Sequence, residues 1–568
     1  MCGIAGYIGK NLKEDRLLKM LKAQSHRGPD YTGTYKNKNT FLGHNRLSII
    51  DLSEESNQPF LDNSKRYSII FNGEIYNYLE LKEELKEEYI FNTSSDTEVL
   101  LAAFIKWGKD CLHHLNGMFS FAIWDKLEEK LFAARDRFGV KPFYYSYKDS
   151  TFVFASEIKA LHVFGIKKSP NKKVWANYFS FGSYGLPNET FWEEIQQLPG
   201  SYFLEYKKGQ LNVEKWYFFE KEIEKQKKGR TLQEVEKEYT ALLKDSISLR
   251  FRADVPVGFN ISGGLDSSVL LAFVNILYKK NTQNIKGYTF YTNDERYDEL
   301  PWVEEMISLT NNPLTKVLLE SSEVKELSIN MSVFQDEPYG GLPTIAYSKI
   351  FKKAKEEGTV VLLDGQGMDE QWAGYDYYMQ NNNATIQGVN SSPFRKNVLS
   401  KEILEYAEKP IYDKPFKDEL LNKQYRDLFY TKIPRALRFN DRISMAHSRE
   451  LREPFLDYRL VEYAFSLPKE FKINKGIQKF VLRNIVSKHL SDNISFAPKR
   501  PLQTPQREWI GDELYDFIYT KIVSLKNTKE KTWFDFNEIE KELKDYKKGN
   551  RNSSFHIWQW LNFSLLIE

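Results

Sequence analysis

The chain of 568 residues is long enough for more than one domain, and we expect two domains of unequal size. Its 81 Lys and Arg nearly balance its 78 Asp and Glu, and it has neither a signal-peptide pattern nor an apolar run of about eighteen residues, so we expect a cytoplasmic protein with no nucleic acid or membrane partner. Having only two cysteines, Cys2 and Cys111, excludes a disulfide framework and a cysteine-rich zinc site.

The chain begins Met1-Cys2-Gly3-Ile4-Ala5-Gly6, so removal of the initiator methionine would make Cys2 the first residue. Such a residue has a thiol and a free α-amine with pKa values of about 8.5 and about 8, and the amine can serve as base for the thiol. A lone Met-Cys is most often an accident of sequence, so this prediction depends on the rest of the chain. While Met1 is present, the nitrogen of Cys2 is an amide and cannot act as that base.

The first two hundred residues combine short strands, glycine-containing turns and two helices. This mixture predicts an α+β domain with stacked sheets. Cys111 lies in an apolar context and is predicted to be buried and structural. The segment 207–230 is dense in Lys and Glu, which indicates an exposed connection between domains. The predicted strands are 67–71, 119–124, 131–134 and 151–155, and the predicted helices are 79–86 and 96–107.

From residue 231 onward, strands and helices alternate, which predicts a parallel sheet covered by helices. Beyond Pro434 the pattern is mostly helical. The predicted elements are an amphipathic helix at 231–250, strands at 255–261, 287–292 and 359–363, and a helix at 268–278.

Between the strand at 255–261 and the helix at 268–278 lies Ser262-Gly263-Gly264-Leu265-Asp266-Ser267-Ser268. Glycines at this place let backbone N–H groups and the helix dipole approach an anion. Asp266 would repel a phosphate directly, so we expect Mg²⁺ to bridge the two. The Gly-Lys-[Ser/Thr] ending of a Walker A loop is missing. The alternative is a Gly-Ser turn with a capping serine.

The pattern Ser-Gly-Gly-x-Asp-Ser resembles the loop of ATP pyrophosphatases, which adenylate a carboxyl or similar oxygen and release pyrophosphate. The resemblance implies ATP and Mg²⁺ as cofactors. A second acidic loop, 363–370, follows the strand at 359–363, and both loops would face one crevice where Asp266 and Asp369 bind the metal. The positions that match ATP-binding residues of the family are Ile261, Ser262, Gly263, Gly264, Asp266, Ser267, Thr292, Asp364 and Gly365.

The N-terminal half resembles the class II glutamine amidotransferase domain in five segments that match in identity and order. These are Cys2-Gly3-Ile4-Ala5-Gly6, Arg27-Gly28-Pro29-Asp30, His44-Asn45-Arg46-Leu47-Ser48-Ile49, Phe71-Asn72-Gly73-Glu74-Ile75-Tyr76-Asn77 and Ser95-Asp96-Thr97-Glu98. Taken alone, Asn72-Gly73 would predict a hairpin turn and Asp96 a helix cap. The joint match makes those separate interpretations improbable.

The resemblance implies a role for each matched residue. The Cys2 thiolate would attack the glutamine amide, and the Asn72 side chain and Gly73 N–H would stabilise the oxyanion, where one such donor is typically worth ~3 kcal/mol. Arg46 would bind the substrate carboxylate, and Glu74 and Asp96 its ammonium group. Ile49 completes the set of residues that match the glutamine-binding positions.

Together the two halves resemble glutamine-hydrolysing asparagine synthetase over nearly the whole chain, including the segments 441–457 and 479–483 and Lys499, which aligns with a lysine beside the adenylate. The resemblance implies an α+β Ntn-hydrolase-type αββα sandwich at 2–206, a charged linker at 207–230, and an α/β parallel-sheet ATP-pyrophosphatase domain with a helical C-terminal part at 231–568. It also suggests a homodimer. Glutamine would yield glutamate and ammonia, and ammonia would pass through a water-poor tunnel to an adenylated carboxylate, giving an amide, AMP and pyrophosphate.

One departure concerns the acceptor. The family usually carries Ser-Gly-Glu-Gly-Ser-Asp-Glu in the second loop, whereas this chain has Asp364-Gly365-Gln366-Gly367-Met368-Asp369-Glu370. Gln366 cannot accept a proton as the glutamate would. The resemblance implies aspartate as the small-molecule acceptor, and the departure at Gln366 motivates an alternative, another carboxylate such as a uronic acid. A non-catalytic binding protein that keeps the fold is a third possibility, which the intact motif residues disfavour.

Overall fold

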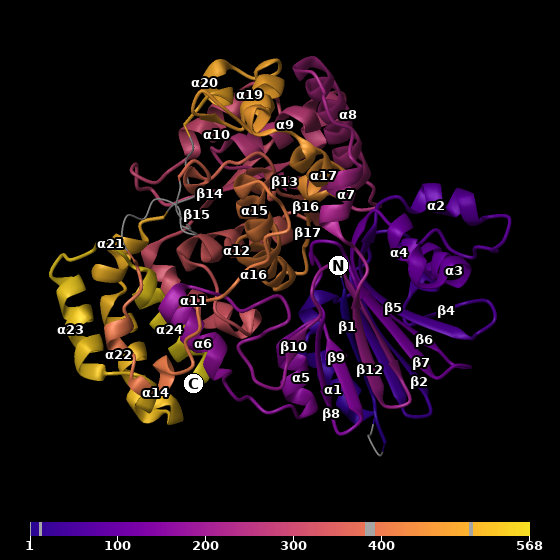
Figure 1. Ribbon diagram of the computed structural model, residues 1–568, viewed down its shortest axis with the longest axis horizontal. Helices are drawn as coiled ribbons and strands as arrows, with labels where there is room; N and C mark the ends of the chain where they lie inside the picture. The colour runs from indigo at the N-terminus through magenta and orange to yellow at the C-terminus, as the bar shows by residue number, and fades with distance from the viewer. Residues whose placement is uncertain (1, 11–13, 381–391, 499–503) are drawn as a thin grey trace.

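The computed structural model describes residues 2–10, 14–380, 392–498 and 504–568. Its N-terminal part contains two stacked antiparallel sheets (Figure 1), with α1 (Asp15–Ala23) and α5 (Ile158–Phe164) against the first and α3 (Asp96–Trp107) against the second. The strand order of the first sheet is β10 (Gln196–Gln197), β8 (Tyr144–Lys148), β9 (Thr151–Ala155), β1 (Gly3–Ile8), β3 (Thr40–Arg46) and β2 (Tyr31–Asn37). That of the second is β12 (Gln210–Lys215), β11 (Tyr202–Lys207), β7 (Lys130–Arg135), β6 (Gly117–Asp125), β5 (Tyr67–Ile75) and β4 (Phe60–Leu61).

The central strands β1 and β6 are buried along nearly their whole length, because a second sheet covers one face and helices cover the other. Both are accordingly made almost entirely of apolar and small residues. The αββα sandwich expected from the sequence is confirmed. The predicted bounds of α3 and β9 are confirmed, and β5 continues to Ile75. Asn72 and Gly73 therefore lie inside a strand, and the isolated interpretation as a hairpin turn does not apply.

The segment 207–230, expected from its charge to be an exposed connection, is partly ordered into regular elements. Strand β12 pairs with β11 at the edge of the second sheet. It is followed by α7 (Phe219–Lys225), which buries Phe219 and Ile223. The spacing of these two apolar residues, four apart, is typical of a short amphipathic helix and is the pattern that indicates α7 within the charged segment.

The second part of the chain is built on a parallel sheet of five strands, as predicted from the strand and helix alternation. Helix α8 (Leu232–Arg250) begins with a capping box between Thr231 and Glu234. Helix α9 (Leu265–Leu277) begins inside the glycine loop, three residues earlier than expected. The strand order is β15 (Leu314–Leu318), β14 (Gly287–Tyr291), β13 (Val257–Asn260), β16 (Val361–Leu363) and β17 (Glu450–Arg452).

Helices surround this sheet and form the C-terminal region, as predicted. Helix α6 (Lys172–Phe181) precedes the sheet in sequence but packs against α24 (Phe555–Ile567), so the two parts of the chain interlock (Figure 1). No helix within the described ranges is both long and apolar enough to span a bilayer. The other long helices are α2 (Tyr78–Leu85), α10 (Leu300–Ser308), α11 (Ser321–Gln335), α12 (Gly341–Glu356), α15 (Glu419–Arg426), α16 (Ile433–Met445), α17 (Tyr458–Ser466), α19 (Phe480–Ser487), α22 (Tyr515–Ser524) and α23 (Phe536–Lys547).

Candidate active sites

The first candidate site is a cavity of about 30 Å³ between the start of β1, the end of β3, the end of β5 and the start of α3. It brings together most of the residues that the sequence predicted for glutamine. Burial raises the pKa of the Cys2 thiol above its ordinary value, and the thiol donates to the Leu47 carbonyl over 3.8 Å. The predicted residues that line this cavity are Cys2, Arg46, Ile49, Gly73, Glu74 and Asp96.

Asn72 is completely buried beside the cysteine. Its Oδ1 accepts the Cys2 backbone N–H at 3.1 Å, whereas its Nδ2 has no hydrogen-bond partner among the described residues. A buried amide donor without a partner is costly unless a ligand uses it. Gly73 is required beside it because an added Cβ would lie 2.2 Å from the Met118 carbonyl oxygen of the neighbouring strand.

The charged groups of this cavity are held in place by polar contacts. The Arg46 guanidinium donates to the Ser53 carbonyl at 2.7 Å and to Asn57 Oδ1 at 2.8 Å. Asp96 accepts the Ile75 backbone N–H at 2.9 Å, yet burial raises the pKa of Asp96 to about 6. Burial, followed by the neighbouring Asp96, also raises the pKa of Glu74 well above its usual range. The cavity therefore contains two carboxyl groups that a cationic ligand would stabilise.

The second candidate site is a cavity of about 170 Å³ at the carboxyl ends of β13 and β16. The glycine loop forms one side, and its Gly263 N–H donates to the Glu299 carboxylate at 2.9 Å, so the loop already binds an anionic group. The two loops touch, because a Cβ on Gly365 would lie 3.4 Å from Asp266. The predicted residues that line this cavity are Ser262, Gly263, Gly264, Asp266, Ser267, Asp364, Gly365 and Asp369.

Lys479, just before α19, joins the two acidic loops. Its Nζ lies 2.5 Å from Asp266 Oδ1 and 2.7 Å from Asp369 Oδ1. Although burial opposes its charge, these two carboxylates raise the pKa of Lys479 above its ordinary value. Two carboxylates around one cation fit the ligands that Mg²⁺ takes when phosphates complete its shell. No cluster of three or more His, Cys, Asp or Glu ligands occurs in the described part of the chain.

The remaining predicted residues lie elsewhere. Ile261 lines a smaller cavity of about 10 Å³ next to the second site. Thr292 lines neither cavity, and its backbone N–H and hydroxyl both donate to Asp298. Lys499, predicted beside the adenylate, lies outside the described residues, as does Met1.

Several residues of the second cavity received no role from the sequence. Lys479 and Arg483 had been noted only as part of a matching segment, and their spacing of four on a helix was the available signal. The others come from separate elements, so that no local pattern connects them. These residues are Asn260, Glu299, Tyr347, Gln478, Lys479 and Arg483.

Comparison with known proteins agrees with this two-site arrangement. The glutamine amidotransferase domain family matches residues 1–217, and the asparagine synthase family matches residues 238–568, which is more than half of the chain. The chain belongs to the glutamine-hydrolysing asparagine synthetase family. The resemblance seen in the sequence motifs is thereby confirmed.

Relatives in this family are similar over most of their length but differ in name. Asparagine synthetase [glutamine-hydrolyzing] 3 of Bacillus subtilis is 31% identical, over 88% of this chain and 86% of the relative. Asparagine synthetase [glutamine-hydrolyzing] 1 of the same organism is 29% identical, over 100% and 96%. A protein named amidase chry2 of Gibberella zeae is 26% identical, over 94% and 93%. Membership in this synthetase family therefore does not fix the acceptor.

In this chain the two cavities are connected by β17. Glu74 of the first cavity forms a buried ion pair of 3.0 Å with Arg452. The Arg452 carbonyl oxygen accepts the backbone N–H of Asp364, which lines the second cavity, at 2.9 Å. Arg452, from the second part of the chain, thus contacts one residue of each cavity.

Proposed function

We propose that this protein is a glutamine-dependent asparagine synthetase that uses ATP and Mg²⁺. The observation that supports the proposal best is the pair of cavities in one chain, one with a buried cysteine beside a free amide donor and the other with a glycine loop facing an acidic loop. The first suits amide hydrolysis, and the second suits adenylation.

In the first cavity Cys2 attacks the side-chain amide of glutamine. Nδ2 of Asn72 donates to the oxyanion that develops, and the Gly73 N–H is the second donor. Glu74 and Asp96 bind the α-ammonium group and Arg46 the carboxylate, with Ile49 packing beside them. Loss of Met1 would free the Cys2 amine, which then acts as base for the thiol. The products are glutamate and ammonia.

In the second cavity the N–H groups of Gly263 and Gly264 and the hydroxyls of Ser262 and Ser267 bind the phosphates of ATP at the start of α9. Asp266 and Asp369 would hold Mg²⁺, which would supply positive charge to offset the negative charge of the pyrophosphate. Lys479 and Arg483 add positive charge on the same side. Further ATP contacts are assigned to Ile261, Thr292, Asp364 and Gly365, and Lys499 would stabilise the adenylate.

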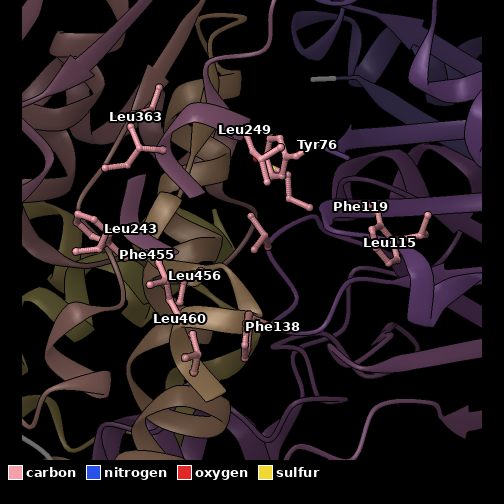
Figure 2. Packing of buried hydrophobic residues seen from close by; sticks show 14 of the residues in the cluster. Tyr76, Leu115, Phe119, Phe138, Leu243, Leu249, Leu363, Phe455, Leu456 and Leu460 are labelled. Atoms are coloured by element: carbon pink, nitrogen blue, oxygen red, sulfur yellow. The ribbon is translucent and has the colours of Figure 1, made fainter. Parts of the chain in front are cut away.

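The region between the sites favours passage of ammonia in neutral form. One continuous hydrophobic cluster crosses the junction of the two parts (Figure 2). It contains Tyr76 and Phe138 from the first part and Leu363 and Phe455 from the second. Such surroundings disfavour ammonium, because burying a charge without a partner is costly.

Two polar groups in the second cavity support aspartate as the acceptor. Oδ2 of Asp364 and both polar side-chain atoms of Asn260 are buried and have no hydrogen-bond partner among the described residues. A carboxylate beside an amide complements an α-ammonium group, which aspartate has and a uronic acid lacks. Gln366, which stands in place of the usual family glutamate, lines the same cavity. For this reason a uronic acid is the alternative acceptor.

The test is an acceptor screen for pyrophosphate and AMP release with ATP, Mg²⁺ and ammonium, comparing aspartate with uronic acids. We expect release with aspartate and none with uronic acids, and the reverse result would reassign the acceptor. Cys2→Ala should abolish amide synthesis from glutamine and retain synthesis from ammonium, because it removes only the nucleophile of the first cavity. Full glutamine hydrolysis by this variant would refute the assignment of Cys2.

A further inference from the structure

Glu453 is a buried carboxyl group to which the proposed chemistry gives no task. It follows β17 directly and is only 4% exposed. Its Oε2 has no hydrogen-bond partner within the described ranges. A buried carboxyl oxygen without a hydrogen-bond partner destabilises the fold, so we expect a ligand or a reaction to use it.

The surroundings place Glu453 between the second cavity and the domain junction. On the cavity side are the backbone N–H of Gln366, which is bonded to the carboxylate, and the carboxyl group of Asp364. On the junction side are Lys141 and Arg250. Lys141 belongs to the first part of the chain and donates to the Leu451 carbonyl at 3.4 Å, only two residues before Glu453.

Neither cation neutralises Glu453 in an ion pair. Arg250 instead pairs with Asp457 at 3.0 Å and donates to Ser246 Oγ at 2.8 Å. Burial, followed by the charge of Asp364, raises the pKa of Glu453 well above its ordinary value, while Lys141, the Gln366 N–H and Arg250 act in the opposite direction. The group is thus a stronger base than an exposed glutamate, next to Asp364 and Gln366 of the cavity lining.

We propose that Glu453 is the base that accepts a proton from ammonia during amide formation. This inference rests on the proposed function. The ammonia nitrogen forms a bond to the acyl carbon of the adenylate, and the bond from that carbon to the AMP oxygen breaks, with its electron pair leaving on AMP. One N–H proton passes to the Glu453 carboxylate, and the neutral amide remains.

The step requires a base because ammonia becomes positively charged as its bond to carbon forms. Unless that nitrogen loses a proton, ammonia leaves the acyl carbon again and no amide forms. Gln366, which lines the cavity and whose backbone N–H is bonded to Glu453, cannot accept it. Asp266 and Asp369 pair with Lys479 and are the proposed ligands of Mg²⁺. Glu453 has the unpartnered oxygen and lies between the cavity lining and Lys141 of the first part of the chain.

The experiment compares Glu453→Gln with wild type in the full-length protein, using aspartate and three measurements. We expect ammonium-dependent amide formation to fall about 10²- to 10⁴-fold, the usual contribution of a general base. ATP–pyrophosphate exchange should remain near wild type, because adenylation precedes the proton transfer. Hydroxamate formation with hydroxylamine should also persist, since this weaker base loses its proton to water more readily.

The matched control is Glu462→Gln, which alters a buried carboxyl on α17 that is bonded to Tyr217 at 2.7 Å and belongs to neither cavity. It should leave all three activities near wild type. Glu453→Asp, which retains a carboxyl group, should recover part of the amide formation. A Glu453→Gln protein with unchanged amide formation, or with all three activities reduced together, would overturn the inference. A wild-type protein without exchange on aspartate would overturn the proposed function itself.

Discussion

At the scale of single residues, Glu74 and Asp96 stand out as two buried carboxyl groups lining the cavity of Cys2. Oε1 of Glu74 has no hydrogen-bond partner in the described part of the chain. Like charges close together in a buried place disfavour double ionisation. A substrate ammonium group would reverse this effect, so that ligand binding and ionisation of the pair are linked.

This linkage predicts a pH dependence of glutamine binding. Asp96 has a raised pKa of about 6, so it is ionised at neutral pH and becomes neutral as the pH falls below that value. A neutral Asp96 cannot attract the ammonium group, and KM for glutamine should rise up to about tenfold per pH unit below the pKa. Glutaminase kinetics from about pH 8 to about pH 5 measure this rise. A KM that stays constant across pH 6 would contradict the role of Asp96.

The residues of the first cavity could be predicted because short contiguous motifs contain them. Asn72, Gly73 and Glu74 are neighbours in one strand, and the strand geometry fixes where each points. Of the residues that line the second cavity, only those of its two loops could be predicted from the sequence. Lys479 bonds to a residue 213 positions away in sequence, and no periodicity or local propensity encodes such a contact.

At the scale of elements, β17 has a larger role than its three residues suggest. All three residues are buried, and Arg452 donates to the carbonyl oxygens of Arg250 at 2.8 Å and Arg252 at 2.7 Å. The same guanidinium pairs with Glu74 and with Glu450. Burial by itself raises the pKa of Glu450, but the neighbouring Arg452 guanidinium counteracts it, and this pKa lies at about 2. This strand was not predicted, because its three residues are too few to show a period.

Arg452→Met should therefore destabilise the protein and impair glutamine use. Removing one partner of a buried ion pair leaves an uncompensated charge and costs about 3–5 kcal/mol. Denaturant unfolding should show this loss, and Glu74→Gln in the same chain should recover part of it. Arg449→Met is the control, because Arg449, 8% exposed against 0% for Arg452, donates to the carbonyls of Thr359 and His447. Equal losses for Arg452→Met and Arg449→Met would argue against a special role of the ion pair.

At the scale of the whole molecule, the two parts meet through a buried polar contact as well as through the hydrophobic cluster. Arg27 is fully buried and forms two hydrogen bonds to Asp441 of α16, at 2.8 and 3.1 Å. It also donates to Glu157 at 3.0 Å and to the Cys2 carbonyl at 3.0 Å. One guanidinium thus connects Cys2 to a helix of the second part of the chain.

The two kinds of fold could be predicted from the sequence because each half carries its own motifs, but this interface could not. Arg27 and Asp441 both lie in segments that match the family, yet they are 414 residues apart and only the folded chain pairs them. A motif identifies which residue types are present, whereas a contact between distant motifs depends on how the two parts pack. The packing of α6 against α24 is another contact of this kind.

Arg27→Met should lower the stability of the protein and uncouple its two activities. The change leaves Asp441 and Glu157 buried with weaker compensation, at a cost of about 3–5 kcal/mol. It also releases the strand that holds Cys2 from α16, so more glutamate should form per amide produced. Arg252→Met is the matched control, since Arg252 spans the same junction but pairs with the exposed Glu80, and such a pair contributes at most about 1 kcal/mol. The two variants are compared by denaturant unfolding and by the ratio of glutamate to asparagine. If Arg27→Met kept the wild-type ratio despite its lower stability, the contact would stabilise the fold without coupling the sites.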